Sequence, residues 1–365
     1  MPLDLDARLL QLCSRVEPLD QSAMDAARAR QDQLTKPAGS LGRLERLSVQ
    51  LAGITRTPRP RLKHKAIVVM AGDHGVVAEG VSAYPASVTP QMVLNFVRGG
   101  AAINVLARQA GARVVVVDMG IAVDLAPDLP IVHRKIAYGT ANLATGPAMT
   151  RAQAAAAIIA GTEVVAQECA RDLDVICLGE MGIGNTTAAA AITAAITGLP
   201  AAEVTGRGTG INDSVWQHKV AIIERGLQAN RPRADDPLDV LVKVGGLEIA
   251  GLVGVILASA ARRIPVIVDG FIATAAALIA GEFCPNTRGY MIAAHRSVEV
   301  GHRVALHHLE LEPLLVLDLR LGEGTGAALA LPLLDASLAL LDEMATFEEA
   351  GVAAASAGAS DGVRA

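Results

Sequence analysis

The sequence predicts an α/β fold, with a Rossmann-like parallel sheet and helices on both of its faces. Short apolar runs alternate with helical segments from residue 66 onward, which is the order of βαβ units. The runs are continuously apolar rather than alternating, as in strands buried on both faces. Polar, glycine-rich segments follow the runs directly. In a parallel sheet such segments meet at one edge, and ligands bind there.

The length, composition and charge limit the classes of protein to which the chain can belong. With 365 residues, 52% of them apolar and 19% charged, the chain suffices for one large α/β domain, with or without a smaller appendage. Aromatic residues make up only 2%, which argues against a stacking surface for single-stranded nucleic acid. The net charge of −5 gives no basic footprint for DNA or an anionic membrane.

The N-terminus and the cysteines predict a cytoplasmic location. MPLDLDARLL is acidic where a signal peptide is basic, and no run of about twenty apolar residues predicts a membrane-spanning helix. Cys13, Cys169, Cys177 and Cys284 form no CxxC motif and have no histidine at ligand spacing. Free thiols in a reducing compartment are therefore expected, in preference to disulfides or zinc.

The first 60 residues are expected to be helical and connecting. Residues 22–30 and 41–51 carry Leu, Ala and Val at helical spacing. The motif LTKPAGSLGRLE joins them, and its proline and glycine interrupt the helix. Ser40 in this motif is the candidate cap of the second helix.

From residue 66 onward, strands and helices are expected to alternate. The expected strands are AIVVM, RVVVVDMG, DVICLG, IPVIVDG, YMIAAH and LLVLDL, at residues 66–70, 113–120, 174–179, 264–270, 290–295 and 314–319. The expected helices lie at 89–111, interrupted at Gly99-Gly100, at 150–169, where TRAQ is a capping box, and at 185–197. The Ala/Gly/Ser-rich tail after Gly351 is expected to be disordered.

The segment GEMGIGNTT, at the end of the third expected strand, partly matches a phosphate-binding P-loop. Gly179, Gly184 and Thr186 fit the pattern GxxxxGK[ST], but Asn185 occupies the lysine position, which disfavours ATP hydrolysis. A phosphate could still bind the backbone N–H groups of a helix N-terminus here. The carboxylate of Glu180 suits a ribose hydroxyl better than a phosphate.

Two further glycine clusters carry positive charge. In GRGTGIND, residues 206–213, glycines allow close backbone approach, and Arg207 and the later Lys219 supply charge for an anion. The alternative is a turn that only begins a helix. In KVGGLEIAGLVG, residues 243–254, Lys243 could balance a substrate charge. The small residues of this segment are expected to pack its helix on a neighbour.

The segment Gly72-Asp73-His74-Gly75 follows the first expected strand and could suggest a metal site or a catalytic dyad. No second cluster of histidines or carboxylates at ligand spacing accompanies it, so a structural or substrate-contact role is expected. No GxSxG motif occurs, so no Ser/His/Asp hydrolase is predicted.

The turn LGEGTG contains the strongest catalytic candidate. Gly322, Gly324 and Ala327 satisfy the dinucleotide pattern G-x-G-x-x-A, but no later strand completes a βαβ unit, and a carboxylate between the glycines would repel pyrophosphate. A nicotinamide-dinucleotide oxidoreductase is therefore the less favoured alternative. Glu323 is better explained as a general base, because the glycines leave room for a flat substrate and partial desolvation favours proton acceptance.

Six motifs together closely resemble the nicotinate-nucleotide–dimethylbenzimidazole phosphoribosyltransferase family. They are LTKPAGSLGRLE, AGDHGVVAEGVSAYP, LGEMGIGNTT, KVGGLEIAGLVG, VDGFI and LGEGTGAALALPLLDA, in this order along the chain. The resemblance implies transfer of the phosphoribosyl group of nicotinate mononucleotide to 5,6-dimethylbenzimidazole. The products would be nicotinate and α-ribazole 5′-phosphate, for the lower ligand of cobalamin. No cofactor and no metal are implied.

The resemblance also implies the domains and the assembly. Residues 1–60 and 335–350 would form a small helical domain, residues 61–334 the α/β catalytic domain, and residues 351–365 a tail. The expected form is a homodimer that acts on small molecules and binds neither nucleic acid nor membrane. A non-catalytic sensor of nicotinate mononucleotide is an alternative, and the intact GEGTG turn counts against it.

The site residues that the resemblance implies fall into three groups. Glu323 is the general base. The benzimidazole pocket comprises Ser82, Tyr84, Pro85, Gln91, Met181 and Leu321. The nucleotide site comprises Glu180, Gly182, Gly206, Gly208, Gly210 and Lys219. The residues alone do not decide whether Lys219 or Arg207 contacts the phosphate.

Overall fold

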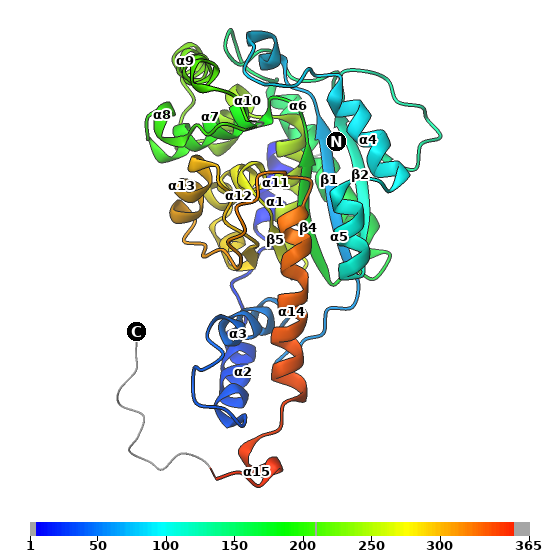
Figure 1. Ribbon diagram of the computed structural model, residues 1–365, viewed down its shortest axis with the longest axis vertical. Coiled ribbons are helices and arrows are strands. Elements are labelled where there is room, and N and C mark those ends of the chain that lie inside the picture. The colour runs from blue at the N-terminus through cyan, green and yellow to red at the C-terminus, as the bar shows by residue number, and fades with distance from the viewer. Residues whose placement is uncertain (1–4, 209, 354–365) are drawn as a thin grey trace. The chain divides into compact units, whose positions relative to one another are not determined.

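The structure, a computed structural model, describes residues 5–208 and 210–353 (Figure 1). The chain divides into two compact units. The larger lies within Met1–Pro18 and Lys63–Ala330, and the smaller within Leu19–Leu62 and Leu331–Ala365. The expected small domain of residues 1–60 therefore differs from the structure at residues 5–18, which lie in the larger unit. From residue 354 on, the expected tail lies outside the described residues.

The larger unit is built on a six-stranded sheet in which all neighbouring strands are parallel. The strands are β1 (Lys65–Gly72), β2 (Ala112–Gly120), β3 (Val132–His133), β4 (Val175–Met181), β5 (Val266–Val268) and β6 (Met291–Ala293). Their order across the sheet is β3-β2-β1-β4-β5-β6. The order reverses between β1 and β4, and ligands in such sheets bind beside this reversal, at the carboxyl ends of the strands.

The helices of the larger unit follow the strands in the expected alternation. They are α1 (Leu5–Cys13), η1 (Gly75–Glu79), α4 (Val88–Arg98), α5 (Ala102–Ala110), α6 (Arg151–Cys169), α7 (Asn185–Thr197), α8 (Ala201–Val204), α9 (Asp213–Asn230), α10 (Pro237–Val244), α11 (Leu247–Ala260), α12 (Phe271–Phe283), η2 (Pro285–Tyr290) and α13 (Val300–His308). The interruption at Gly99 is confirmed, since α4 ends there, and so is the capping box of α6 at Thr150.

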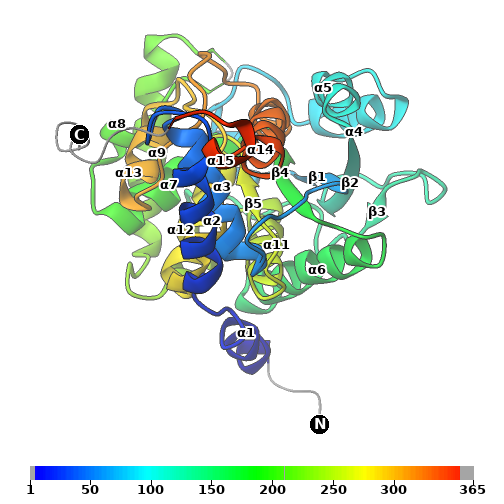
Figure 2. The same ribbon diagram turned by 90° about the horizontal axis from the view of Figure 1, so that it is seen from below.

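Both faces of the sheet are covered by helices, as predicted (Figure 2). Successive residues of a strand point to opposite faces. Ile67 of β1 lies against the start of α14 (Thr325–Glu343), since a Cβ on Gly324 would be 2.8 Å from its Cγ2 atom. Met70 lies on the other face against α11, since a Cβ on Gly251 would be 3.3 Å from its Sδ atom. Helices α4 and α5 share the α14 side, whereas α6 packs on α11.

Helices α6 and α11 pack so closely that their backbones touch. A Cβ on Gly161 would overlap the carbonyl oxygen of Gly251, and a Cβ on Gly254 would overlap that of Ile158. The predicted packing role of the α11 glycines is confirmed for Gly251 and Gly254.

The expected strand at residues 314–319 is wrong. Leu315 makes only an isolated parallel bridge with His295, beyond the end of β6. Asp318 has a φ of 54°, which takes the backbone out of the extended region. Val316 and Leu317 are about half exposed, so this apolar run is not a buried strand. The turn that carries Glu323 therefore follows an irregular segment.

The expectation of four free thiols is wrong for one pair. Cys13 and Cys284 form a disulfide, with their Cα atoms 5.7 Å apart. The bond joins the end of α1 to the end of α12, and Leu9 of α1 is buried. These contacts explain why α1 belongs to the larger unit. Cys169 and Cys177 are free.

The smaller unit packs two N-terminal helices against a C-terminal one. It contains α2 (Gln21–Gln33), α3 (Arg43–Thr55), the end of α14 and α15 (Phe347–Ala350). Ala27, Val49, Ala52 and Leu341 form its buried apolar cluster. The predicted cap at Ser40 is wrong, because α3 begins after Gly42 without a side-chain cap.

One described helix, α14, has the length and apolar composition that could cross a membrane. Within its most apolar window, 56% of the residues are buried in the protein, as in a core helix. The test rests on length and composition only, so it is weak support for a membrane span.

Candidate active site

The turn around Glu323 lies against β1 and β4, the two strands between which the order reverses. Gly322, Glu323 and Gly324 all have positive φ, at 82°, 63° and 88°. A Cβ on Gly179 of β4 would lie 2.5 Å from the carbonyl oxygen of Glu323, so the turn rests directly on that strand. A glutamate with this φ is strained, which is a feature that clusters at functional sites.

The carboxylate of Glu323 is buried beside the N-terminus of α5. Its Oε2 atom accepts a hydrogen bond of 3.3 Å from the backbone N–H of Ile103, the second residue of that helix. Burial raises the pKa of Glu323; the Ile103 hydrogen bond lowers it, and the negative charge of Asp269 raises it further. The net shift is upward, which makes Glu323 a stronger base than an exposed glutamate.

Glu180, at the end of β4, lies next to the same turn. A Cβ on Gly322 would overlap its Oε1 atom, and the Nδ2 group of Asn185 donates to its Oε2 atom. Burial raises the pKa of Glu180 to about 8, and the nearby carboxylates of Asp269, Glu248 and Glu323 add to the effect. The structure thus brings Glu180 and Glu323 together, as the positions of their segments predict.

His74, which follows β1, and Glu248, at the start of α11, form a buried pair next to the loop after β4. The His74 Nε2 and Glu248 Oε1 atoms are 2.6 Å apart, and both side chains are fully buried. Burial alone would lower the pKa of His74, but the Glu248 carboxylate more than offsets it, so the pKa is raised. A Cβ on Gly182 would lie 3.5 Å from His74 Cδ2, so the pair supports the loop after β4.

The glycines at 206–210 adjoin a buried lysine. Lys219 of α9 is 1% exposed, and its Nζ atom donates a 2.7 Å hydrogen bond to the Thr186 hydroxyl at the start of α7. A Cβ on Gly208 would be 3.4 Å from the Lys219 Nζ atom. Burial lowers the pKa of Lys219 to about 8, against the opposing effect of the Glu299 carboxylate.

Glu299 holds the same glycine loop. Its Oε1 atom accepts a 2.8 Å hydrogen bond from the backbone N–H of Gly208, and a Cβ on Gly206 would overlap its carboxylate. Its Oε2 atom is buried without a hydrogen-bond partner. No sequence signal distinguished Glu299 from the surface carboxylates.

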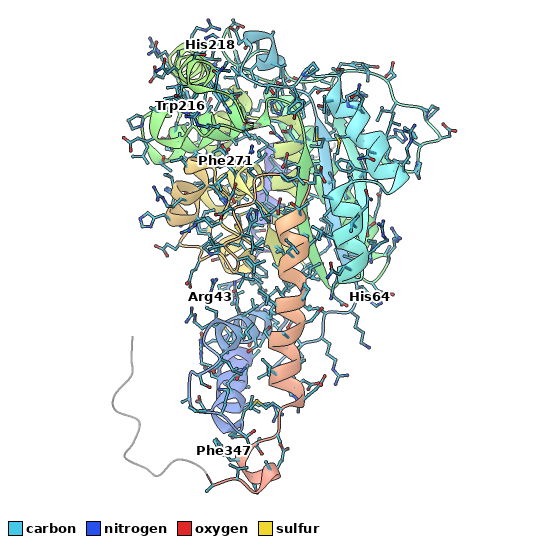
Figure 3. The ribbon with its side chains drawn as sticks, in the orientation of Figure 1. Arg43, His64, Trp216, His218, Phe271 and Phe347 are labelled. Atoms are coloured by element: carbon cyan, nitrogen blue, oxygen red, sulfur yellow. A yellow bond between two sulfur atoms is a disulfide. The ribbon has the colours of Figure 1, made fainter. Side chains whose placement is uncertain are left out.

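Arg207 lies outside this buried group. Its guanidinium is half exposed and pairs with Asp213 and with the carbonyl oxygen of Ile211. It lines an open pocket of about 590 Å³ together with Trp216 and Arg320. Trp216 points from α9 (Figure 3) and donates a hydrogen bond to the Thr205 carbonyl oxygen. Because Lys219 is buried beside the glycines and Arg207 is exposed, Lys219 is the better candidate to contact an anionic ligand at the carboxyl end of the sheet.

Three of the predicted benzimidazole residues, Ser82, Tyr84 and Pro85, lie on the segment that leads into α4. Tyr84 is 53% exposed, and its backbone N–H donates a hydrogen bond to the Ser82 hydroxyl. The start of α4 is tied to the loop after β4, because the Thr89 hydroxyl accepts a 3.1 Å hydrogen bond from the N–H of Ile183. Pro85 lies on this segment and Gln91 in the first turn of α4, and both are exposed, as is Leu321 before the Glu323 turn. Met181 ends β4 and is partly buried.

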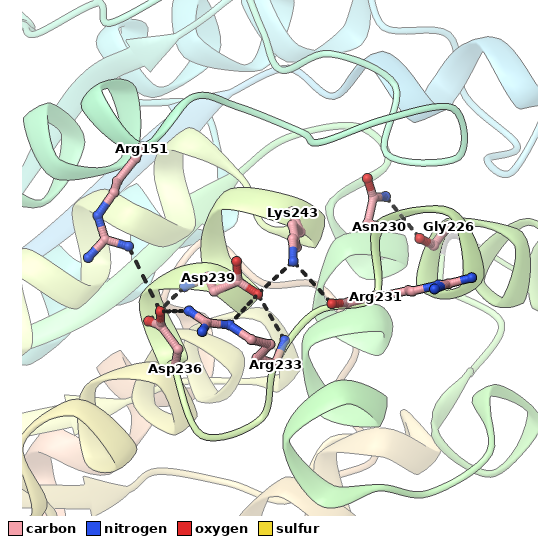
Figure 4. A network of polar contacts seen from close by, with 8 residues as sticks. All are labelled: Arg151, Gly226, Asn230, Arg231, Arg233, Asp236, Asp239 and Lys243. Atoms are coloured by element: carbon pink, nitrogen blue, oxygen red, sulfur yellow. Dashed lines mark hydrogen bonds and ion pairs between the residues drawn. The ribbon is translucent and has the colours of Figure 1, made fainter.

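Lys243 does not face the sheet edge as a free cation. Figure 4 shows its ammonium between the Asp239 carboxylate, at 2.9 Å, and the carbonyl oxygen of Arg231, at 3.0 Å. Asp236 caps α10 in the same network. The charge of Lys243 is therefore balanced by Asp239 of the same helix, α10, which counts against the predicted role of Lys243 in balancing a substrate charge.

Sequence reasoning missed Asp269, Glu299 and the pairing of His74 with Glu248. Asp269 had a usable signal, because it follows an apolar strand directly, as Glu180 follows another. No group of three or more metal-binding side chains is present in residues 5–208 and 210–353.

The fold and these buried carboxylates are those of an α/β protein with a candidate ligand site at the reversal of its parallel sheet. The chain belongs to a phosphoribosyltransferase family, whose model, described as "Phosphoribosyltransferase", matches residues 16–352. The resemblance seen in the sequence motifs is thereby confirmed.

Relatives and solved structures agree with this family. A protein of Chloroflexus aurantiacus named nicotinate-nucleotide–dimethylbenzimidazole phosphoribosyltransferase is 61% identical over 339 residues, 93% of this chain and 97% of that one. A Roseiflexus protein of the same name is 56% identical over 94% of this chain and 98% of its own. The crystal structure of the Thermus thermophilus enzyme of that name superposes with a TM-score of 0.88 at 48% identity, covering 92% of this chain and 100% of that chain.

Proposed function

We propose that this protein transfers the phosphoribosyl group of nicotinate mononucleotide to 5,6-dimethylbenzimidazole. The products are α-ribazole 5′-phosphate and nicotinate, in the lower-ligand branch of cobalamin biosynthesis. The observation that carries the proposal is the buried Glu323 carboxylate between two glycines of positive φ, beside Glu180 at the sheet reversal. Relatives at 54–61% identity that are named for this activity support it.

The chemistry needs one base and two correctly placed rings. Glu323 takes the N–H proton of the azole while the lone pair of the other ring nitrogen forms a bond to C1′ of the ribose. The bond from C1′ to the nicotinate ring breaks, and its electron pair stays on the pyridine nitrogen. Attack from the opposite face converts a β-glycosidic bond into an α-bond. Much of the rate then comes from holding the two rings on either side of C1′.

The nucleotide residues have matching chemistry. Glu180 is a hydrogen-bonding partner for the ribose hydroxyls, and Gly182, Gly206, Gly208 and Gly210 allow close backbone approach. Lys219 supplies a positive charge for the phosphate, next to the N-terminus of α7. Ser82, Tyr84, Pro85, Gln91, Met181 and Leu321 stay the predicted azole pocket.

Incubation with nicotinate mononucleotide and 5,6-dimethylbenzimidazole tests the function. We expect released nicotinate and α-ribazole 5′-phosphate in equal amounts, measured by chromatography. Binding of the mononucleotide without release would instead favour a sensor. Tight binding of a nicotinamide dinucleotide with hydride transfer would favour an oxidoreductase.

We predict that Lys219→Met weakens binding of nicotinate mononucleotide about 10- to 150-fold, because a hydrogen bond to a charged group contributes about 1.5–3 kcal/mol. Isothermal titration measures the effect. Since the pKa of Lys219 is about 8, wild-type affinity should fall as the pH rises through 8, and the variant should lose this dependence. Arg207→Met is the matched control and should change affinity little. The reverse result would assign the phosphate contact to Arg207.

A cytoplasmic homodimer is the proposed working form. Exposed apolar side chains of the larger unit offer a surface for a second copy; they are Val298, Val300, Val316 and Leu317. Disulfides are rare in a reducing cytoplasm, so the redox state of Cys13 and Cys284 in the cell is a direct test of this location. Sedimentation velocity measures the assembly, and thiol titration of the protein isolated from its cells measures the redox state.

A further inference from the structure

Asp269 is a buried carboxylate that contacts the backbone just after the general base. It follows β5 directly and is 2% exposed. Its Oδ2 atom accepts a 3.2 Å hydrogen bond from the backbone N–H of Gly324, and its Oδ1 atom accepts a 2.9 Å hydrogen bond from that of Ala327. One carboxylate thus spans the end of the Glu323 turn and the first residues of α14.

The Glu323 turn needs such support because its conformation is strained. A non-glycine residue in the left-handed region is unfavourable and persists only where its surroundings hold it. Gly179 of β4 is in close contact with the Glu323 backbone. Thr325 donates two hydrogen bonds to the Gly322 carbonyl oxygen, one of 3.0 Å from its N–H and one of 2.8 Å from its hydroxyl. Asp269 is the side chain from a neighbouring strand end that bonds to the residue following Glu323.

Asp269 is also a charge that acts on the base. Its negative charge raises the pKa of Glu323, and four backbone N–H groups oppose the burial that raises its own pKa to about 7. The titratable groups next to this pair are Glu180 and Cys177 of β4 and His295 after β6, and Glu248 of α11 acts on Glu180. The His295 Nε2 atom is 3.7 Å from Asp269 Oδ1, and burial lowers the pKa of His295. Across the described residues, no lysine or arginine forms an ion pair with Asp269.

We infer that Asp269 is a positioning residue for the transfer reaction. Its hydrogen bonds to Gly324 and Ala327 fix the Glu323 carboxylate where it takes the azole proton. The inference rests on the proposed function of the site. It predicts that loss of Asp269 damages proton removal more than it damages binding of the nucleotide.

The test is Asp269→Asn, assayed with two acceptors that differ in N–H acidity. An asparagine amide cannot accept from both backbone N–H groups, so the turn loses part of its support. With 5,6-dimethylbenzimidazole we expect kcat to fall about 10²-fold, as for a misplacement of about 1 Å, while KM for nicotinate mononucleotide changes little. With 5,6-dichlorobenzimidazole, whose N–H is more acidic and needs less help from a base, the loss should be at least about threefold smaller. Glu323→Gln should show the same trend.

The ratio of the losses with the two acceptors does not depend on how much of the variant folds. Asp118→Asn is the matched control: Asp118 is equally buried at the end of β2, and it accepts from the Ile121 N–H and pairs with Lys135. Asp118→Asn should change kcat by the same factor with both acceptors. An equal loss with both acceptors for Asp269→Asn would overturn the positioning role alone. A wild-type protein that releases no nicotinate would overturn the proposed function and this inference together.

Discussion

Replacing Glu323 by glutamine is expected to lower kcat about 10²- to 10⁴-fold, the range that general-base assistance contributes. The amide has the same shape and can still accept from the N–H of Ile103, so binding of nicotinate mononucleotide should be retained. The amide cannot take the azole proton. Initial rates of nicotinate release, with titration of the mononucleotide in parallel, separate the two effects.

The pH profile gives a second measure of the same role. A base must be deprotonated to act, so wild-type kcat should rise with pH through the pKa of Glu323 and then level off. Burial raises that pKa, so the rise should lie above the range of an ordinary glutamate. Glu323→Gln should lose this rise.

Asp318→Asn is the matched control for Glu323→Gln. It makes the same change from acid to amide five residues earlier, at an exposed position. Asp318 has a positive φ, which asparagine also tolerates. It should leave kcat near the wild-type value. Near-normal turnover by Glu323→Gln would remove Glu323 from the role of base.

The fold and the glycine turn of the base could be predicted from sequence because their signals are local. Continuous apolar runs predicted the strands β1, β2 and β4. The glycines on both sides of a single carboxylate indicated Glu323 as the candidate base. The apolar run at 314–319 misled because hydrophobicity alone does not make a strand. Pro313 and the left-handed Asp318 limit its extended length, and β6 beside it has only three residues.

The rest of the site depends on pairings between distant segments. Asp269 reaches Gly324 across 55 residues, and His74 reaches Glu248 across 174. Cys13 and Cys284 are 271 residues apart. Neither spacing nor composition encodes which distant partners meet, since that is set by the order of strands across the sheet. The pKa shifts of Glu180 and Lys219 follow from this same assembly and are equally invisible in the sequence.

Glu248→Ala is expected to lower the free energy of unfolding by about 3–5 kcal/mol, because it leaves a fully buried histidine without its partner. Chemical denaturation followed by circular dichroism measures the loss. Glu248→Gln should cost less, since its amide oxygen can still accept from the Nε2–H of a neutral His74. Glu163→Ala removes an exposed carboxylate paired with Arg134 at 3.2 Å and should cost at most about 1 kcal/mol.

The pH dependence of stability separates charge from hydrogen bonding in this pair. The folded-state pKa of His74 is raised, so its contribution to stability is fully present below the unfolded value of about 6.5 and is lost as the pH rises through the folded value. Glu248→Gln should flatten this dependence, because the amide no longer stabilises the imidazolium. A double variant, His74→Phe with Glu248→Leu, should recover part of the loss, since apolar replacements of a buried pair are often neutral. A Glu248→Ala variant as stable as Glu163→Ala would mean that the histidine finds another partner and that the pair does not hold the loop after β4.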